Sequence, residues 1–246
     1  HPDVLFLAEA FTRPKIMNEL AKQGFSQSYT YFTWRNSKKE LTDYVTELTQ
    51  TEQKEFYRPN FWPNTPDINP FALQSGNESV HLQKYFLAAT LSSSVGIYGP
   101  VFEYRVCEPM AVGKEEYLNS EKYEYYHWDW SIQNKLTTLI TRINAIRNEQ
   151  ASLQQTNNIT FCDTNNEQVM AYYKFDDARD NETFMVVSLD AFNNAQAMVR
   201  IPIEQLGNQP LKVEDLITGN TYYWDKEWNF VELSPALPFH LFKIIR

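Results

Sequence analysis

The chain has 246 residues, is 43% hydrophobic and carries a net charge of −9. This is enough apolar material for one large core or two smaller ones. The negative charge argues against a nucleic-acid binder, which normally presents a basic face, and against docking on an anionic membrane. The longest apolar stretches are too short for a membrane-spanning helix.

The scarce residue types predict no metal, no cofactor and a reducing environment. Cys107 and Cys162 are the two cysteines, fewer than a secreted disulfide scaffold uses, which indicates a cytoplasmic protein. The four histidines lack zinc-ligand spacing, and the glycines form no phosphate-binding loop. Because the chain starts at His1 inside a strand pattern, we expect it to be cut from a longer protein.

The first half of the sequence alternates strand and helix patterns. An apolar strand over residues 4–8 ends on Glu9 and is followed by a short helix over 15–23. Residues 26–34 are rich in β-formers. Residues 37–50 have helical spacing, with Ser37 and Glu40 forming a capping box.

The second pair of units follows the same alternation. Residues 56–70 predict a strand that runs into a proline-rich loop. Residues 81–96 predict a helix stopped by Gly96, 96–104 a short strand and turn, and 131–150 a strongly periodic helix. Four β–α units in series indicate parallel strands joined by crossover helices, which is half of an eight-fold (βα)8 barrel of the TIM type.

From about residue 157 the pattern changes to short strands separated by turn residues. About ninety residues of this kind predict an antiparallel β-sandwich. The polar stretch 151–158 marks the boundary. The predicted organisation is therefore α/β plus all-β, with a half-barrel over 1–152 and a β-sandwich over 157–246.

Aromatic residues make up 15% of the chain, and many stand beside polar residues, as in SYTYFTWRN (28–36), FYRPNFWPN (56–64) and KYEYYHWDW (122–130). Rings beside hydrogen-bonding groups suit the faces and hydroxyls of sugars. Filling of a core is the alternative, which we place first, although composition alone does not decide between the two.

Two carboxylates follow predicted strands at the edge where barrel enzymes place functional residues, Glu9 after the first strand and Asp67 after the third. Paired carboxylates are the minimum for glycoside chemistry. The apolar neighbours of Glu9 favour retention of its proton by desolvation. A helix cap or a salt bridge is the alternative role for each. Lys122 and Tyr123, in the loop before the last helix, are expected to face the same edge, with a solvated loop as the alternative.

Four motifs carry a resemblance that covers essentially the whole chain: FLAEAFTRP, NFWPNTPDI, SEKYEYYHWDW and LITRINAIRNEQASL. Together they resemble the C-terminal half of the maltosyltransferases that use α-maltose 1-phosphate to extend α-1,4-glucans, a branch of the α-amylase superfamily. Ordinary amylases typically have histidine before the third carboxylate, whereas this chain has Pro66. The resemblance implies strands five to eight of the barrel, the C-terminal β-sandwich and a retaining mechanism.

The resemblance also implies residue roles. Glu9 would be the general acid/base, and Asp67 would stabilise the transition state. Lys122, Tyr123 and Asn64 are expected to bind substrate. The family's nucleophile, an aspartate after strand four, would fall upstream of His1, so we expect these 246 residues to be inactive alone.

Two other functions stay open: a fragment of an α-amylase-type hydrolase, and a carbohydrate-binding module without a reaction. The expected partners are α-maltose 1-phosphate and an α-1,4-glucan, and no nucleic acid or membrane. A half-barrel would expose a strand edge and an apolar face, which predicts homo-oligomers or pairing with the missing N-terminal half.

Overall fold

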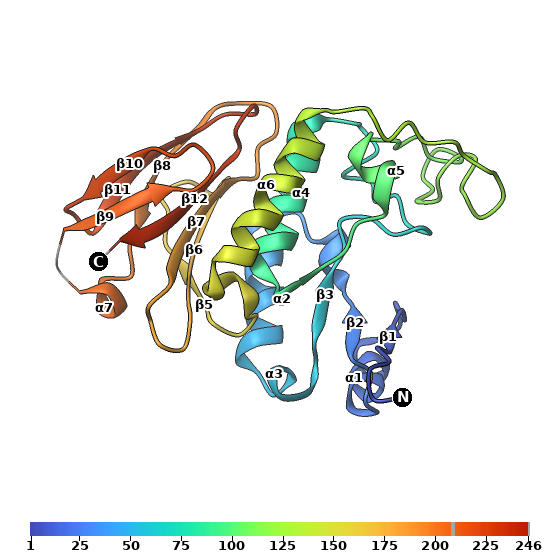
Figure 1. Cartoon of the computed structure of the whole chain (residues 1–246), viewed down its shortest axis with the longest axis horizontal. Coiled ribbons are helices and arrows are strands. Elements are labelled where there is room, and N and C mark those ends of the chain that lie inside the picture. The colour runs from blue at the N-terminus through green and yellow to red at the C-terminus, as the bar shows by residue number, and fades with distance from the viewer. Residues whose placement is uncertain (208–209, 246) are drawn as a thin grey trace.

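The computed structural model describes residues 1–207 and 210–245. It combines a four-stranded parallel sheet, in the order β1-β2-β3-β4, with antiparallel strands in a six-stranded sheet, β10-β9-β12-β7-β6-β5, and a two-stranded sheet, β11-β8. Figure 1 shows helices α4 and α6 between these two parts. Within the described ranges, no helix is both long and apolar enough to cross a membrane.

The parallel part follows the predicted β–α alternation, and all three strand pairings are parallel. Its strands are β1 (Leu7–Ala8), β2 (Gln27–Tyr29), β3 (Pro59–Phe61) and β4 (Ser94–Val95). Its helices are α1 (Pro14–Lys22), the 3-10 helix η1 (Tyr31–Trp34), α2 (Lys38–Gln50), α3 (Gln53–Phe56), α4 (Glu78–Leu91), α5 (Gly99–Glu103) and α6 (Lys135–Glu149), followed by the 3-10 helix η2 (Ala151–Gln154).

The local signals at helix α2 are confirmed. The Ser37 hydroxyl accepts a hydrogen bond from the Glu40 amide at 3.3 Å, and the Glu40 carboxylate accepts from the Ser37 amide at 3.0 Å. This reciprocal capping box satisfies amide groups that the helix itself leaves unpaired. Asn134 starts α6 in the same way, so this helix begins at Lys135 and not at residue 131.

Three predicted elements need correction. Within 26–34 only Gln27–Tyr29 is strand, because η1 follows directly. Helix α4 begins at the Asn77 cap and ends at Leu91, since Ser92 is already extended, so Gly96 does not stop it. The strand precedes Gly96, and Gly99–Glu103 is helix α5 where a strand and turn were predicted, with Pro100 in its first turn.

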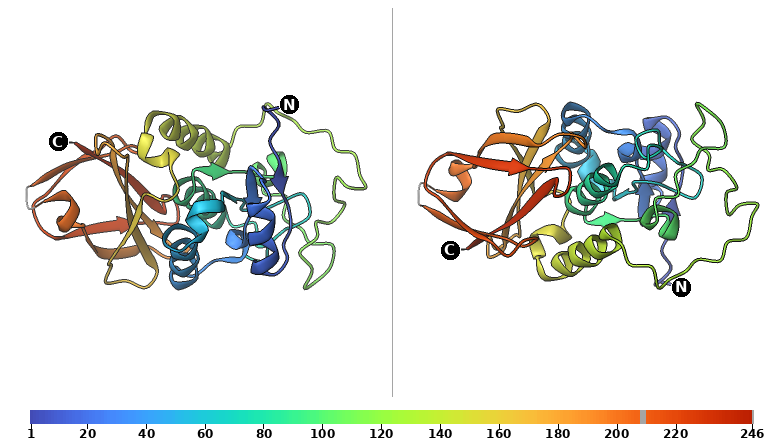
Figure 2. Two further views of the ribbon diagram at one scale, coloured as in Figure 1. Left: turned by 90° about the horizontal axis from the view of Figure 1, so that it is seen from below. Right: turned by 90° about the horizontal axis from the view of Figure 1, so that it is seen from above.

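The antiparallel part contains the short strands expected after residue 157. They are β5 (Ile159–Cys162), β6 (Val169–Phe175), β7 (Glu182–Ser188), β8 (Ala195–Arg200), β9 (Leu211–Asp215), β10 (Thr221–Trp224), β11 (Trp228–Leu233) and β12 (Phe239–Ile245), with the short helix α7 (Ile203–Leu206) after β8. A second apolar core, including Tyr173, Phe184 and Trp224, lies between the six-stranded sheet and the β8–β11 pair. Figure 2 shows this part at one end of the molecule.

Helix α4 joins the two parts and is buried on nearly every side. The rings of Phe86 on α4 and Phe239 on β12 stack with centroids 4.1 Å apart, and both side chains are 0% exposed. The Thr90 and Tyr172 hydroxyls lie 2.5 Å apart, and the buried Lys174 ammonium donates to the Thr90 carbonyl at 3.3 Å. Apolar and polar contacts therefore cross the same junction.

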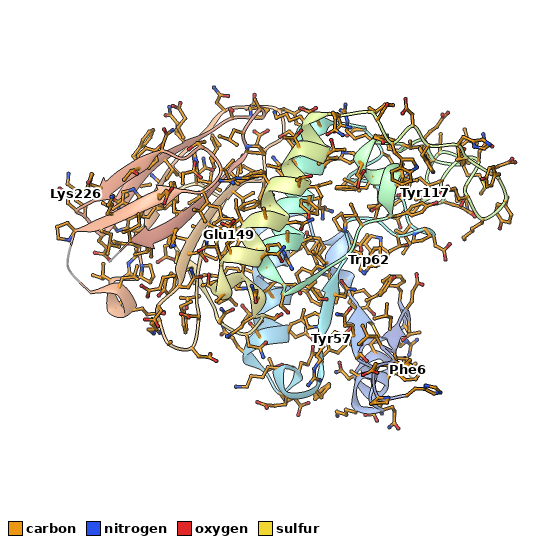
Figure 3. All side chains as sticks on the ribbon, in the orientation of Figure 1. Phe6, Tyr57, Trp62, Tyr117, Glu149 and Lys226 are labelled. Atoms are coloured by element: carbon orange, nitrogen blue, oxygen red, sulfur yellow. The ribbon has the colours of Figure 1, made fainter. Side chains whose placement is uncertain are left out.

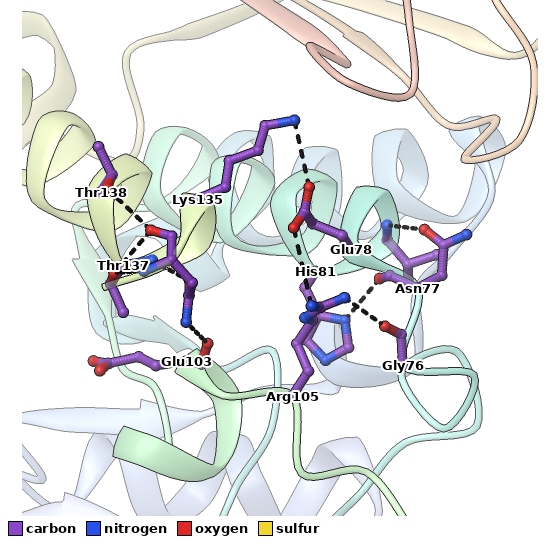
Figure 4. Close-up of polar contacts among 11 residues, drawn as sticks. Gly76, Asn77, Glu78, His81, Glu103, Arg105, Lys135, Thr137 and Thr138 are labelled. Carbon is purple, nitrogen blue, oxygen red and sulfur yellow. Dashed lines mark hydrogen bonds and ion pairs between the residues drawn. The ribbon is translucent and has the colours of Figure 1, made fainter. Parts of the chain in front are cut away.

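Ion pairs fasten the start of α4 to neighbouring segments (Figure 4). Glu78 lies 3.4 Å from the Lys135 ammonium and 4.0 Å from the Arg105 guanidinium. Arg105 also donates to the Gly76 carbonyl at 3.0 Å, and Asn134 donates to the Glu103 carbonyl at 3.0 Å. These contacts hold both ends of the long segment between α5 and α6.

The pair formed by His240 and Asp215 makes a testable contribution to stability. Nδ1 of His240 lies 3.0 Å from Asp215 Oδ2, and its Nε2 lies 3.1 Å from the Glu232 carbonyl. Burial works against both charges, yet the hydrogen bonds raise the pKa of His240 and lower the pKa of Asp215 overall.

We expect the pair to stabilise the fold most between roughly pH 4 and 6.5, the ordinary pKa values of Asp and His. The histidine contribution is lost as the pH rises through its raised pKa, and the aspartate contribution as the pH falls through its lowered pKa. Urea unfolding across pH, compared with His240→Gln, measures this. The exposed His127, changed to Gln, is the control. Parallel profiles for wild type and His240→Gln would refute the expectation.

Candidate active site

A glutamate, two aromatic residues and a glycine lie at the carboxyl ends of the four parallel strands, at one edge of the sheet. Glu9 follows β1, Tyr29 ends β2, Trp62 follows β3, and Gly96 follows β4. In Figure 3, Tyr57 and Trp62 mark the two ends of β3, with Trp62 on the side of the loop that carries Tyr117. The loops that follow parallel strands all lie at the same edge of the sheet, which is the usual position of active sites in this architecture.

Asp67 and Lys122 form an ion pair at this edge. Lys122 Nζ lies 2.6 Å from Asp67 Oδ1 and 3.8 Å from Glu116 Oε1. The hydrogen bond to Asp67 raises the pKa of Lys122. A turn holds the carboxylate, because the Asp67 amide donates to the Thr65 hydroxyl at 3.2 Å. The structure thus joins two residues that lie 55 positions apart in the sequence.

Glu9 is electrostatically coupled to this pair. Partial burial is the largest cause that raises the pKa of its carboxyl, the negative charge of Asp67 raises the pKa further, and Lys122 lowers it. The direction matches the expectation from its apolar neighbours, although the side chain reaches solvent and Leu7 is 47% exposed. A carboxyl group with a raised pKa, next to a second carboxylate that pairs with a lysine, is an arrangement that glycoside chemistry can use.

Opposite substitutions should shift the Glu9 pKa in opposite directions. Asp67→Asn removes a negative charge, so we expect the pKa of Glu9 to fall. Lys122→Met removes the positive charge that favours its ionised form, so we expect the pKa of Glu9 to rise. Titration of the Glu9 carboxyl carbon by 13C NMR measures both shifts. Shifts of the same sign, or none, would contradict the coupling.

The other two predicted residues lie differently. Asn64 is 1% exposed, its amide nitrogen donates to the Tyr117 hydroxyl at 2.9 Å, and its oxygen accepts from the Tyr98 amide at 3.0 Å. The Asn64 amide therefore connects two loops of this edge, and its contact with substrate stays a prediction. Tyr123 is 77% exposed and stands next to Lys122, outside the Asp67 ion pair.

Sequence reasoning missed an aromatic cluster around Glu9. The Phe11 ring lies 6.0 Å from Tyr29 and 5.1 Å from Trp34, and Tyr29 stacks on Trp62 at 4.8 Å with an interplanar angle of 24°. Burial and the charge of Glu9 raise the pKa of Tyr29. Apart from Phe11, these rings come from the aromatic stretches 28–36 and 56–64, whose composition does not distinguish core filling from sugar binding.

The long segment after α5 is tied to this cluster. The indole nitrogen of Trp34 donates to Glu115 at 3.0 Å, and the Trp128 indole donates to Glu121 at 2.9 Å. The Tyr98 hydroxyl also donates to Glu121. In the aromatic stretch KYEYYHWDW (122–130), Tyr125 and Trp130 are exposed to solvent. Some aromatic side chains of this loop therefore pack against the protein and others face solvent.

No group of three histidine, cysteine, aspartate or glutamate side chains could hold a metal ion among residues 1–207 and 210–245. This edge also brings together a carboxyl group with a raised pKa, a second carboxylate, an ammonium group and aromatic ring faces. Groups of these kinds can transfer protons, carry charge and contact a sugar ring.

Comparison with known proteins agrees with the resemblance seen in the motifs. Residues 161–244 match a family profile described as "GLGE, C-terminal". The chain is 48% identical to the α-1,4-glucan:maltose-1-phosphate maltosyltransferase of Chlorobaculum tepidum, over 99% of this chain and 38% of that protein. It is 46% identical to the protein of the same name from Methylacidiphilum infernorum, over 99% and 37%. The chain thus spans little more than a third of the curated relatives it matches.

Solved structures share its fold at low sequence identity. The α-amylase of Geobacillus thermoleovorans, solved with acarbose, superposes with a TM-score of 0.73 at 13% identity, over 100% of this chain and 54% of that enzyme. A maltogenic α-amylase of Thermotoga neapolitana gives 0.70 at 13% identity, over 99% and 55%. The fold is therefore that of α-amylase-type enzymes, matched over about half of their length.

Proposed function

We propose that this chain is the C-terminal part of a maltosyltransferase that moves maltosyl units from α-maltose 1-phosphate to the non-reducing end of α-1,4-glucans. The observation that carries the proposal is 48% identity, over nearly the whole chain, to a relative of that name. Glu9, Asp67 and Lys122 at the carboxyl edge of the sheet support it, since Glu9 has a raised pKa next to a second carboxylate that forms an ion pair with Lys122.

In this proposal β1 to β4 are strands five to eight of a (βα)8 barrel, over 1–152, and residues 157–246 are a C-terminal β-sandwich. The parallel order of β1 to β4 supports the first assignment. The antiparallel pairing after residue 159 and the profile match over 161–244 support the second. Amylase structures that match over about half their length fit this division.

The proposed reaction retains configuration in two displacements. A carboxylate nucleophile, which the resemblance places outside these 246 residues, attacks the anomeric carbon while Glu9 gives its proton to the departing phosphate oxygen. Glu9 then accepts the proton of the acceptor's 4-hydroxyl as that oxygen displaces the nucleophile. Asp67 stabilises the positive charge that develops on the sugar, and Lys122 and Tyr123 contact the donor sugar. Proton count and charge balance without a cofactor.

The apolar edge next to Glu9 supports association with another chain segment. Strand β1 is an edge strand, and Val4, Leu5 and Phe6 are each about half exposed or more. Exposed edges and apolar faces favour association, so we propose homo-oligomers or pairing with the N-terminal half of the barrel. The two free cysteines support a cytoplasmic location.

Phosphate release tests the function. The full-length protein that carries this chain, given α-maltose 1-phosphate and a short maltooligosaccharide, is expected to release phosphate and lengthen the acceptor. The 246-residue chain alone is expected to do neither. Cutting of starch to reducing sugars without phosphate release would identify an amylase-type hydrolase. Oligosaccharide binding that survives Glu9→Gln and Asp67→Asn, with no turnover by the full-length protein, would identify a binding module.

A further inference from the structure

The position of Glu9 is only weakly fixed by its own strand. Strand β1 pairs through Leu7 and Ala8 alone, at the edge of the sheet, and Glu9 lies beyond the last pair. The next fixed point is Phe11, whose ring packs edge-on against Tyr29. The Phe11 ring also packs edge-on against Trp34, with centroids 5.1 Å apart, so Tyr29 is one of the two rings that fix the segment after Glu9.

Tyr29 is held by a chain of contacts that crosses the whole parallel sheet. Its ring stacks on Trp62, and the Trp62 indole lies over Gly96, where an added Cβ would be 2.2 Å from Cε2. Carbon atoms do not approach so closely, so the indole occupies the space that any side chain at position 96 would need. We call Phe11, Tyr29, Trp62 and Gly96 the aromatic relay; each lies in a different strand or shortly after its end.

In the part of the chain that the structure describes, the Trp62 side chain is held in place by packing and not by hydrogen bonds. Its ring nitrogen is buried and has no hydrogen-bond partner within the described residues. The indole is therefore held by its stack on Tyr29, in the space that Gly96 leaves open. Loss of the Tyr29 ring removes the stack, and a side chain at position 96 would displace the indole.

We propose that Tyr29, Trp62 and Gly96 are positioning residues that hold Glu9 and limit its contact with water through the aromatic relay. This inference rests on the proposed function for its catalytic meaning, because it assigns the relay to the proposed acid/base. The charge of Asp67 raises the pKa of the Glu9 carboxyl, and the charge of Lys122 lowers it. The charge of Glu9 in turn raises the pKa of Tyr29. A relay variant keeps the charges of Asp67 and Lys122 and changes the side chains that pack near Glu9.

The test measures the Glu9 carboxyl directly in the 246-residue chain. Glutamate labelled with 13C is titrated in wild type and in Gly96→Ala, Tyr29→Leu and Tyr29→Phe, with Glu9→Gln assigning the resonance. We expect Gly96→Ala and Tyr29→Leu to lower the Glu9 pKa towards its ordinary value of 4.5. Tyr29→Phe, which keeps the ring, should retain the wild-type value. Trp228→Leu, on the distant strand β11, is the matched control and should change nothing.

An unchanged Glu9 pKa in a folded Tyr29→Leu variant would overturn the proposal. Resonances of strands β6 and β7 report whether each variant is folded. If Gly96→Ala does not fold, the Glu9 pKa in Tyr29→Leu decides the outcome. In the full-length protein, Gly96→Ala should lower kcat about ten- to a hundredfold and shift the pH limb that belongs to Glu9.

The two parts of the experiment separate the two proposals. A Glu9 pKa shift without any transferase activity in the full-length protein would refute the function and keep the relay. Transferase activity with an unshifted pKa would refute the relay and keep the function.

Discussion

Glu9→Gln in the full-length protein is expected to reduce phosphate release from α-maltose 1-phosphate by about 10²–10⁴-fold, the usual contribution of a general acid/base. Glutamine keeps the size and polarity of the side chain but can neither give a proton to the phosphate nor take one from the acceptor. Because the pKa of Glu9 is raised, the wild-type acid stays protonated to a higher pH than an ordinary glutamate.

The pH profile provides a second readout of the same variant. The wild-type rate should fall where Glu9 loses its proton, and this limb should vanish in Glu9→Gln. Glu19→Gln, an exposed carboxylate on helix α1, is the matched control and should keep full activity. A Glu9→Gln enzyme within tenfold of wild type would assign the acid/base role to another residue.

Phe86→Ala is expected to cost about 3–5 kcal/mol of folding free energy, the range for a truncated core phenylalanine. The Phe86 ring is fully buried and stacks flat against Phe239 of β12. Its loss leaves a cavity at the junction of the two parts. The helix and the sheet that line this cavity are each packed against other elements, so they cannot shift enough to fill it.

Urea unfolding followed by both near-UV circular dichroism and tryptophan fluorescence measures the cost. If the junction couples the two parts, the two signals should shift together in Phe86→Ala. Phe192→Ala removes a ring that is 74% exposed and serves as the control, with an expected change below about 0.5 kcal/mol. A loss below about 1 kcal/mol would show that the Phe86–Phe239 stack contributes little to the junction.

The local parts of the fold can be predicted because the capping residues and residue patterns that specify them span only a few neighbouring positions. The Ser37–Glu40 capping box starts α2 as predicted, and the alternating apolar residues after 157 form antiparallel strands. Errors arose where a longer-range contact decides. Gly96 looked like a helix stop, yet its role is to leave room for Trp62, a residue 34 positions earlier.

The site divides in the same way. The sequence indicates Glu9 and Asp67 because each follows a predicted strand. It indicates Lys122 because this residue lies in the loop before the last helix and in a motif that resembles a known family. The ion pair between Asp67 and Lys122 depends on a long loop that folds back to the sheet. Asn64 belongs to the same motif as Asp67, but its neighbours bury it, which no pattern along the chain could indicate.

The order of the elements, the change from parallel to antiparallel strands and the family resemblance follow from the sequence, because periodicity, capping residues and motifs act over a few neighbouring positions. Which side chains meet depends on the fold: the coupling of Glu9 to Asp67 and Lys122, the stack of Tyr29 on Trp62 over Gly96, and the Phe86–Phe239 junction. Those contacts depend on distances between residues far apart in the chain, and they are set by packing of the whole.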